Sequence, residues 1–140
     1  MTRTRLLLGL VIVAALAAAS CGGDGDDGAA DGGIRLLSAV DSAALLDDPP
    51  SGLVVLDVRT IEEFDEGHIA GAEMLDFYRA DFRQQLDLLD KDTSYLIYCR
   101  SGNRSGQTAA IMEELGFTDV VDVDGGVIAW ADAGLDLVTR

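Results

Sequence analysis

From residue 34 onward, short runs of apolar residues alternate with stretches in which apolar residues recur at helical spacing. The apolar runs predict strands at 34–37, 53–57, 94–98 and 120–123, with weaker strand candidates at 68–69 and 73–75. The amphipathic stretches predict helices up to about 47 after a cap at Ser38 or Asp41, and over 61–66, 78–89, 105–115 and 127–133. This alternation is typical of an α/β fold, and we expect an open parallel sheet of about five strands with helices on both faces.

The amino terminus follows a different pattern. Arg3 and Arg5 precede an apolar run of 14 residues over 6–19, and small residues lead directly to Cys21. A positive start, an apolar middle and a small-residue end form the layout of a secretory signal, and the run is short for a membrane-spanning helix. The segment resembles a bacterial lipoprotein signal, in which the cysteine is lipidated and becomes the new amino terminus. It departs from that pattern at Ala18, where such signals usually carry Leu.

These features divide the chain into a lipoprotein-type signal peptide over 1–20, a flexible tether over 21–33 and a folded domain over 34–140. Residues 22–33 are only Gly, Ala and Asp. Such residues cannot bury apolar surface, so we expect a spacer with a root-mean-square reach of roughly 20 Å. The expected location is the extracytoplasmic face of the cell membrane through a lipid anchor on Cys21. Ordinary cleavage with a secreted or periplasmic product, or an uncleaved anchor, are the alternatives.

The charge balance limits the partners. The chain of 140 residues, enough for one domain, holds 25 acidic residues against 10 lysines and arginines, for a net charge of −15. Loss of residues 1–20 would remove two arginines and no acids, and so bring the charge to −17. Such a charge argues against nucleic acid and against adsorption on acidic lipid. Small anions would also be repelled at long range, so an anionic substrate would need a local cationic site.

Cys99 is the strongest candidate for chemistry. It follows the clearest predicted strand and precedes a predicted helix. A thiol at such a turn meets converging backbone N–H groups and the positive end of a helix dipole, and both stabilise an anion. Arg100 and Arg104 add positive charge, so we expect the pKa of Cys99 to lie below the free value of about 8.5. Lipidation of Cys21 would leave Cys99 as the only free thiol, which favours a functional role.

Four segments in order give the domain a resemblance to the rhodanese homology domain in its single-domain sulfurtransferase form. The resemblance covers about residues 34–140. The segments are Leu56-Asp57-Val58-Arg59, Glu63-Phe64 with Gly67-His68-Ile69-Ala70-Gly71-Ala72, Tyr98-Cys99-Arg100-Ser101-Gly102-Asn103-Arg104-Ser105, and Gly125-Gly126-Val127 through Trp130. Each segment alone is a weak signal, whereas their order and spacing together are specific.

The resemblance implies that Cys99 accepts a sulfane sulfur from thiosulfate or a persulfide donor, holds it as a persulfide and passes it to a thiol or cyanide. It implies no cofactor, and one histidine with one available cysteine argues against a metal site. The expected partners are a small sulfur-containing anion or thiol and, as a further candidate, a protein that donates or accepts sulfur.

The persulfide anion needs a ring of N–H donors, which we expect from the five loop residues after the nucleophile, and a glycine there allows positive φ. The substrate-binding candidates are Arg100, Ser101, Gly102, Asn103, Arg104 and Arg59. Arg104 has bracing of the loop as its alternative role. Arg59 has as its alternative a salt bridge to a carboxylate such as Asp57, Glu62 or Glu63. His68, Trp130 and the Gly125-Gly126 turn are expected mainly to support the fold.

Three other functions compete with an enzyme that moves sulfur. A noncatalytic sulfur carrier or sensor acting with a protein partner is the main alternative, and an inactive family member is disfavoured by the retained cysteine and arginines. Protein tyrosine phosphatases also use a cysteine before a helix, in the pattern His-Cys, five residues, Arg. Here Tyr98 replaces the histidine and Arg104 comes one residue early. The shorter loop predicts a smaller ligand than phosphate.

Overall fold

The computed structural model describes residues 33–140, so the predicted signal peptide, nearly all of the tether and Cys21 lie outside the described residues. Five strands alternate with five helices in this part of the chain. The strands are β1 (Gly33–Leu37), β2 (Val54–Asp57), β3 (Glu73–Met74), β4 (Tyr95–Tyr98) and β5 (Asp119–Val123). The helices are α1 (Ala39–Asp47), α2 (Ile61–Glu66), α3 (Phe82–Asp87), α4 (Asn103–Leu115) and α5 (Gly126–Asp132).

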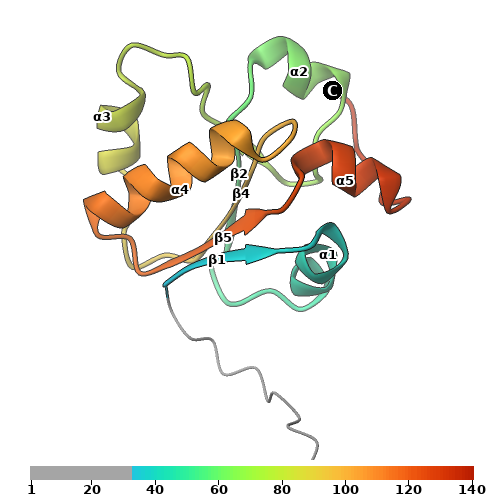
Figure 1. Ribbon diagram of the computed structural model, residues 1–140, viewed down its shortest axis with the longest axis horizontal. Helices are drawn as coiled ribbons and strands as arrows, with labels where there is room; N and C mark the ends of the chain where they lie inside the picture. The colour runs from blue at the N-terminus through green and yellow to red at the C-terminus, as the bar shows by residue number, and fades with distance from the viewer. Residues whose placement is uncertain (1–32) are drawn as a thin grey trace, which may run out of the picture.

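The strands form one sheet in the order β1-β5-β4-β2-β3, and every neighbouring pair is parallel. Helices α3 and α4 pack on one face, and α1 and α5 pack on the other (Figure 1). All four residues of β4 are buried, as expected for a strand in the middle of a sheet that is covered on both sides. The predicted α/β class and five-stranded parallel sheet are therefore confirmed.

The start of α1 has the Ser38 cap that the sequence offered, and the start of α2 has a cap that was not predicted. The Ser38 hydroxyl accepts from the N–H of Asp41 at the start of α1, and Thr60 with Glu63 forms a capping box at α2. The predicted helix over 78–89 was too long, because α3 begins only at Phe82. Turns precede it, and the first of them is stabilised by the Asp76 carboxylate, which accepts from the N–H of Tyr78.

Two weaker predictions are also corrected. The strand candidate at 68–69 is a single antiparallel bridge between His68 and Val138, which joins the end of the chain to the segment after α2. Helix α4 starts at Asn103, two residues earlier than predicted. Gly102 takes φ +90° and turns the chain directly into the helix from the loop over 99–102, which we call the cysteine loop. No helix among residues 33–140 is long and apolar enough to cross a membrane.

Candidate active site

Cys99 lies directly after β4, at the end of the sheet where open parallel sheets place ligands. The residue is only 1% exposed. The backbone N–H of Gly102 donates to Cys99 Sγ at 3.1 Å, and the Ser105 hydroxyl donates to the same sulfur at 3.5 Å. Burial opposes ionisation of the thiol, but hydrogen bonds from Ser105 and from the N–H groups of Ser101 and Gly102 outweigh it. The pKa of Cys99 is therefore lowered, in the predicted direction.

The donors that stabilise the sulfur differ in part from the predicted set. Ser101 and Gly102 belong to the five loop residues that were expected to donate, whereas Ser105 lies one residue beyond them and contributes both its N–H and its hydroxyl. The Asn103 side chain instead accepts from Gln107 Nε2 at 2.9 Å on the surface of α4. The sequence contained Ser105 in the motif, but its role depends on where the helix begins.

Arg104 is held by α2. Its two terminal nitrogens each lie 2.7 Å from an oxygen of Glu63, and its guanidinium lies 5.6 Å from the ring centre of Tyr78. This bidentate ion pair is the main reason that the pKa of Glu63 is lowered to about 2. The geometry is the bracing arrangement that was the alternative role for Arg104. Its guanidinium is committed to a carboxylate, so its charge is largely balanced before any substrate arrives.

Arg59 is also committed, and it is almost fully buried. Its Nε and Nη2 donate to the Asp57 carboxylate at 2.9 and 2.6 Å, and Nη2 donates to the carbonyl oxygen of Gly67 at 2.7 Å. The carboxylate also accepts from the N–H of Arg59 at 2.9 Å. The salt bridge to Asp57 was one of the predicted alternatives, and it fixes the segment between β2 and α2.

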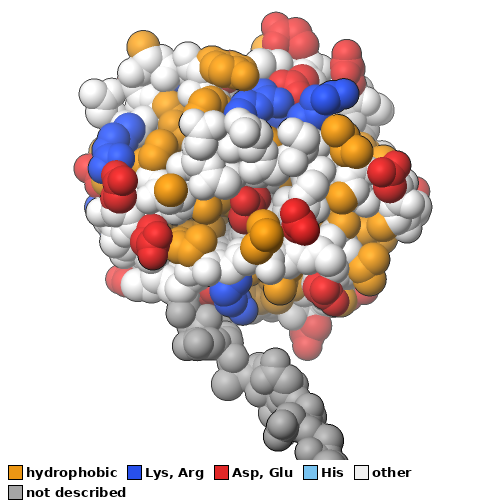
Figure 2. Space-filling model, viewed as in Figure 1, with side chains coloured by type: hydrophobic (Ala, Val, Ile, Leu, Met, Phe, Trp, Pro, Cys, Tyr) orange, Lys and Arg blue, Asp and Glu red, His pale blue; other side chains and the backbone are white. Residues whose placement is uncertain are grey.

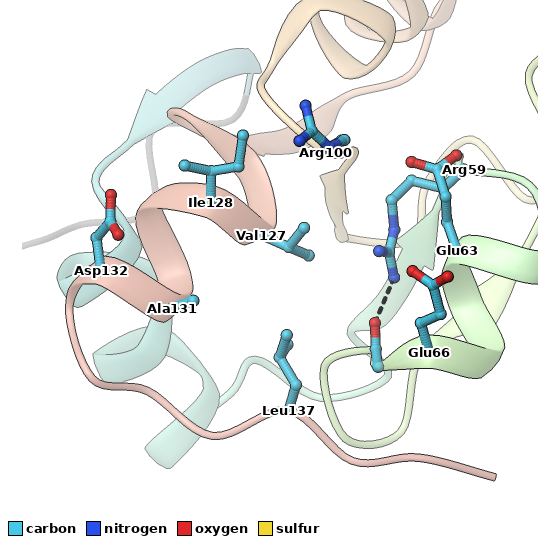
Figure 3. Close-up of a pocket in the computed structure, with 10 residues that line it drawn as sticks. Arg59, Glu63, Glu66, Arg100, Val127, Ile128, Ala131, Asp132 and Leu137 are labelled. Carbon is cyan, nitrogen blue, oxygen red and sulfur yellow. Dashed lines mark hydrogen bonds between the residues drawn. The ribbon is translucent and has the colours of Figure 1, made fainter.

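Arg100 is the exposed arginine of the loop, and no ion pair holds it among residues 33–140. It lies at one end of a cavity of about 410 Å³ between α2 and α5 (Figure 3). Arg59, Glu63 and Glu66 line one side of this cavity, Val127, Ile128, Ala131 and Asp132 the α5 side, and Leu137 lies below them. Cys99 is not among the lining residues. A molecule in this cavity therefore meets the loop at Arg100 rather than at the buried sulfur.

The start of α5 supports the cysteine loop through the backbone. The N–H of Val127 donates to the carbonyl of Cys99 at 3.0 Å, and the N–H of Ile128 donates to the carbonyl of Arg100 at 3.1 Å. A Cβ at Gly126 would collide with the Cys99 carbonyl oxygen and lie 2.8 Å from the Arg100 carbonyl. This glycine is thus required for the close approach of α5. The sequence predicted that the Gly125-Gly126 turn supports the fold, but it gave no sign of this contact between two backbones.

His68 supports the fold, as expected. Its Nδ1 lies 2.9 Å from the carbonyl oxygen of Phe64, and the two rings are stacked with their centres 3.7 Å apart. Trp130 packs in the core on the α1 and α5 side of the sheet and donates from Nε1 to the carbonyl of Asp136 at 3.0 Å. Neither ring is among the hydrogen-bond donors to the sulfur, and both residues stabilise the fold that holds the loop.

Comparison with known proteins places the same elements in one family. The sequence model of the rhodanese-like domain matches residues 38–133. A sulfurtransferase of Allochromatium vinosum is 37% identical over 106 residues, which cover 74% of this chain and 96% of that protein. The thiosulfate sulfurtransferase GlpE of Pseudomonas putida is 44% identical over 80 residues, covering 56% of this chain and 70% of that protein.

A solved structure agrees with these sequence matches. The crystal structure of a rhodanese-related protein from Thermoplasma volcanium covers 76% of this chain and 99% of its own, with 29% identity and a TM-score of 0.66. The chain also matches much larger curated proteins of Mycobacterium tuberculosis, of whose length it spans 20%.

Proposed function

The chain belongs to the rhodanese-like domain family, and from this membership we propose that it is a sulfurtransferase that carries a sulfane sulfur on Cys99 as a persulfide. The observation that carries the proposal is the hydrogen bonding of the Cys99 sulfur by Gly102 and Ser105. These donors favour the thiolate, which is the nucleophilic form of cysteine. They also suit a persulfide, because that group places its negative charge on sulfur inside the same loop.

The proposed reaction has two displacements. The Cys99 thiolate attacks the outer sulfur of thiosulfate, the sulfur–sulfur bond of thiosulfate breaks, and sulfite leaves with the bonding electron pair. A second nucleophile, cyanide or a thiolate, then attacks the outer sulfur of the persulfide. That sulfur leaves with the acceptor, and the Cys99 thiolate is restored. A persulfide donor can replace thiosulfate in the first step, with its thiolate as the leaving group.

Arg100 supports thiosulfate as a donor, because it is the loop arginine without an ion pair among the described residues and it lies at the cavity. A planar guanidinium can donate two parallel hydrogen bonds to a sulfonate-like group. The similarity to a thiosulfate sulfurtransferase agrees with this donor. Arg59 and Arg104 are expected to act less directly, since each already binds a carboxylate.

Mass spectrometry of the full-length chain tests the persulfide. In a Cys21→Ala background, where Cys99 is the only cysteine, thiosulfate should add one sulfur atom that cyanide removes as thiocyanate. The same background with Cys99→Ser should show no adduct and no thiocyanate formation. Thiocyanate production without a labile sulfur on Cys99 would contradict the proposed intermediate.

A sulfur carrier that acts with a protein partner is the second candidate. The buried sulfur, 1% exposed, and the net charge of −15 favour it, because both limit access by free anions. Steady-state turnover distinguishes the two functions. An enzyme should convert thiosulfate and cyanide through many cycles without another protein, whereas a carrier should stop after about one sulfur per chain until its partner is added.

The location of the protein is a separate proposal, supported by the sequence over 3–21. We propose export followed by lipid attachment at Cys21, which would hold the domain at the outer face of the membrane. In a bacterial host, the chain without substitutions should fractionate with membranes and incorporate labelled palmitate. Cys21→Ser should lose the label, and retention of the label by that variant would refute the attachment site.

A further inference from the structure

A buried carboxyl group lies beside the nucleophile. Asp122 is the fourth residue of β5, and its backbone pairs with Ile97 of β4, two residues before Cys99. Side chains alternate along a strand, so Asp122 shares a face with Val120, which packs in one core cluster with Ile97 and Cys99. Asp122 is 4% exposed, and its Oδ1 has no hydrogen-bond partner. Burying a carboxyl group with an unpaired oxygen costs folding free energy, so its presence here needs an explanation.

The first turn of α4 connects this carboxyl group to the sulfur. A Cβ at Gly106 would lie 3.7 Å from Asp122 Oδ2, which shows that the carboxyl group faces this turn. Ser105 is fully buried in the same turn, and its hydroxyl lies close enough to the Asp122 carboxyl group to lower the pKa of that group. The Ser105 hydroxyl oxygen is also 3.5 Å from Cys99 Sγ. The hydroxyl therefore donates to the sulfur and has the Asp122 carboxyl group nearby as a second acceptor for its one hydrogen.

Burial makes this carboxyl group titrate near neutral pH. Loss of hydration is the largest influence and raises the pKa of Asp122 to about 6, although the hydrogen bond from Ser105 opposes the shift. The charge of Asp124 contributes to the increase. The charge of Asp122 therefore changes over a pH range around 6.

Few other charges face Asp122. On β5 itself, Asp119 lies at the opposite end of the strand and is bound by Arg35 of β1 at 2.6 Å, and Asp124 follows in the next turn. The loop after β4 contains Cys99, and α4 contains Arg104, whose guanidinium binds Glu63. Helix α1 packs on the other face of the sheet. The thiol and the Asp122 carboxyl group are thus the two titratable groups that meet at the Ser105 hydroxyl.

We propose that Asp122 is a positioning residue that controls Cys99 through Ser105. A neutral carboxyl group leaves the Ser105 hydrogen bond on the sulfur, where it stabilises the thiolate or the persulfide. An ionised carboxylate draws the hydroxyl toward itself and adds a negative charge next to the sulfur, so the pKa of Cys99 rises. Only protons exchanged with solvent are needed for this change. The proposal rests on the proposed function in taking Cys99 as the nucleophile. Its test measures the pKa of the Cys99 thiol and does not require sulfur transfer.

The test is a pH titration of the Cys99 thiolate in the full-length chain with Cys21→Ala. Thiolate is followed by its absorbance near 240 nm and by the rate of alkylation with iodoacetamide. The parent protein should show two coupled inflections, one of them near pH 6. Asp122→Asn, which preserves size but carries no charge, should show one inflection and a Cys99 pKa lower by about one unit.

Two further variants separate position from charge and from folding. Ser105→Ala should raise the pKa of Cys99, and adding Asp122→Asn to it should then produce a much smaller decrease than in the parent. Asp119→Asn removes a carboxylate from the same strand away from the sulfur and should leave the Cys99 titration unchanged. An unchanged titration in Asp122→Asn would overturn the proposal, and an equal decrease with and without Ser105 would overturn the route through the hydroxyl.

The outcome of this titration distinguishes failure of the Asp122 proposal from failure of the proposed function. A thiolate that responds to Asp122 but never takes up sulfur would leave the present inference standing and contradict the sulfurtransferase. A persulfide that forms on Cys99 while Asp122→Asn has no effect would do the reverse.

Discussion

At the scale of single residues, the three arginines near the cysteine loop have different environments. Arg59 and Arg104 each bind a carboxylate, whereas Arg100 is exposed at the cavity. The sequence identified all three as candidates because it shows residue type and order. It could not separate them, since the partner of Arg104 is Glu63, 41 positions away along the chain. Only the tertiary fold shows which cation is available to a substrate.

Arg100→Lys tests this distinction. The substitution keeps the positive charge but replaces a two-pronged donor with a point charge, so use of thiosulfate should fall about tenfold in kcat/KM, equivalent to ~1.4 kcal/mol. Use of a small persulfide donor, which has no sulfonate group to bind, should fall much less. The measurement is thiocyanate formation with each donor in turn. Equal losses with both donors would argue against a role for Arg100 in binding the sulfonate group.

Glu63→Gln tests the brace between α2 and the loop. The folded-state pKa of Glu63, about 2, lies below its ordinary value of 4.5. The ion pair therefore contributes stability above pH 4.5, and that contribution is lost as the pH falls toward 2. Because the pair is partly exposed, we expect the variant to lose about 1–2 kcal/mol in free energy of unfolding at pH 7.

Urea denaturation at pH 7 and pH 3 measures this effect, and the difference between parent and variant should be clearly smaller at pH 3. The neighbouring exposed carboxylate gives a matched control, since Glu62→Gln should change stability by less than ~0.5 kcal/mol at either pH. A loss for Glu63→Gln that is independent of pH would contradict the ionic origin of the contribution.

At the scale of elements, the strands and the ends of several helices follow from local sequence. Apolar runs gave β2 and β4 almost to the residue, and the predicted bounds of 61–66 agree with α2. The predicted helix over 78–89 extended too far because its apolar spacing continues through the turns before α3. The docking of α5 on the cysteine loop could not be predicted, since it depends on contact between two backbones from separate parts of the chain.

Gly126→Ala tests that docking. The residue has φ +58°, and a Cβ there would meet the Cys99 and Arg100 carbonyl groups. We expect a loss of about 2–4 kcal/mol in free energy of unfolding, together with slower persulfide formation as the loop moves away from α5. Gly134→Ala is the matched control, because Gly134 has φ +73° but no atom within 4 Å of an added Cβ. It should cost only ~1 kcal/mol and leave Cys99 reactivity unchanged. Similar effects of both substitutions would mean that backbone strain, rather than the collision, is responsible.

At the scale of the whole molecule, charge and chemistry oppose each other. The net charge is −15, and basic side chains occur in a few separate clusters among acidic ones on the face shown in Figure 2. Thiosulfate, a dianion, would therefore approach against the overall field and be bound only near the loop. The sequence alone predicted this conflict, because net charge needs no structure. The location of Arg100 at the cavity, by contrast, could be seen only in the folded structure.

The dependence of kcat/KM on ionic strength tests whether the negative charge of the protein repels thiosulfate. Raising inert salt from 10 to 150 mM shortens the screening length from about 30 Å to about 8 Å, so kcat/KM for thiosulfate should increase several-fold. Alkylation of Cys99 by uncharged iodoacetamide should change little over the same range. A decrease with salt for thiosulfate would show that local attraction at Arg100 dominates the approach instead.

The parallel sheet also gives the molecule a direction. Gly33 begins β1, whereas Cys99 follows the last residue of β4, and because all strands run the same way these two points lie at opposite ends of the sheet (Figure 1). With the proposed anchor at Cys21, the lipid would be attached at the end of the sheet opposite Cys99, through a tether long enough to let the domain turn. On that proposal, attachment at the opposite end would favour the transfer of sulfur from Cys99 to molecules in the surrounding medium over transfer to groups within the membrane.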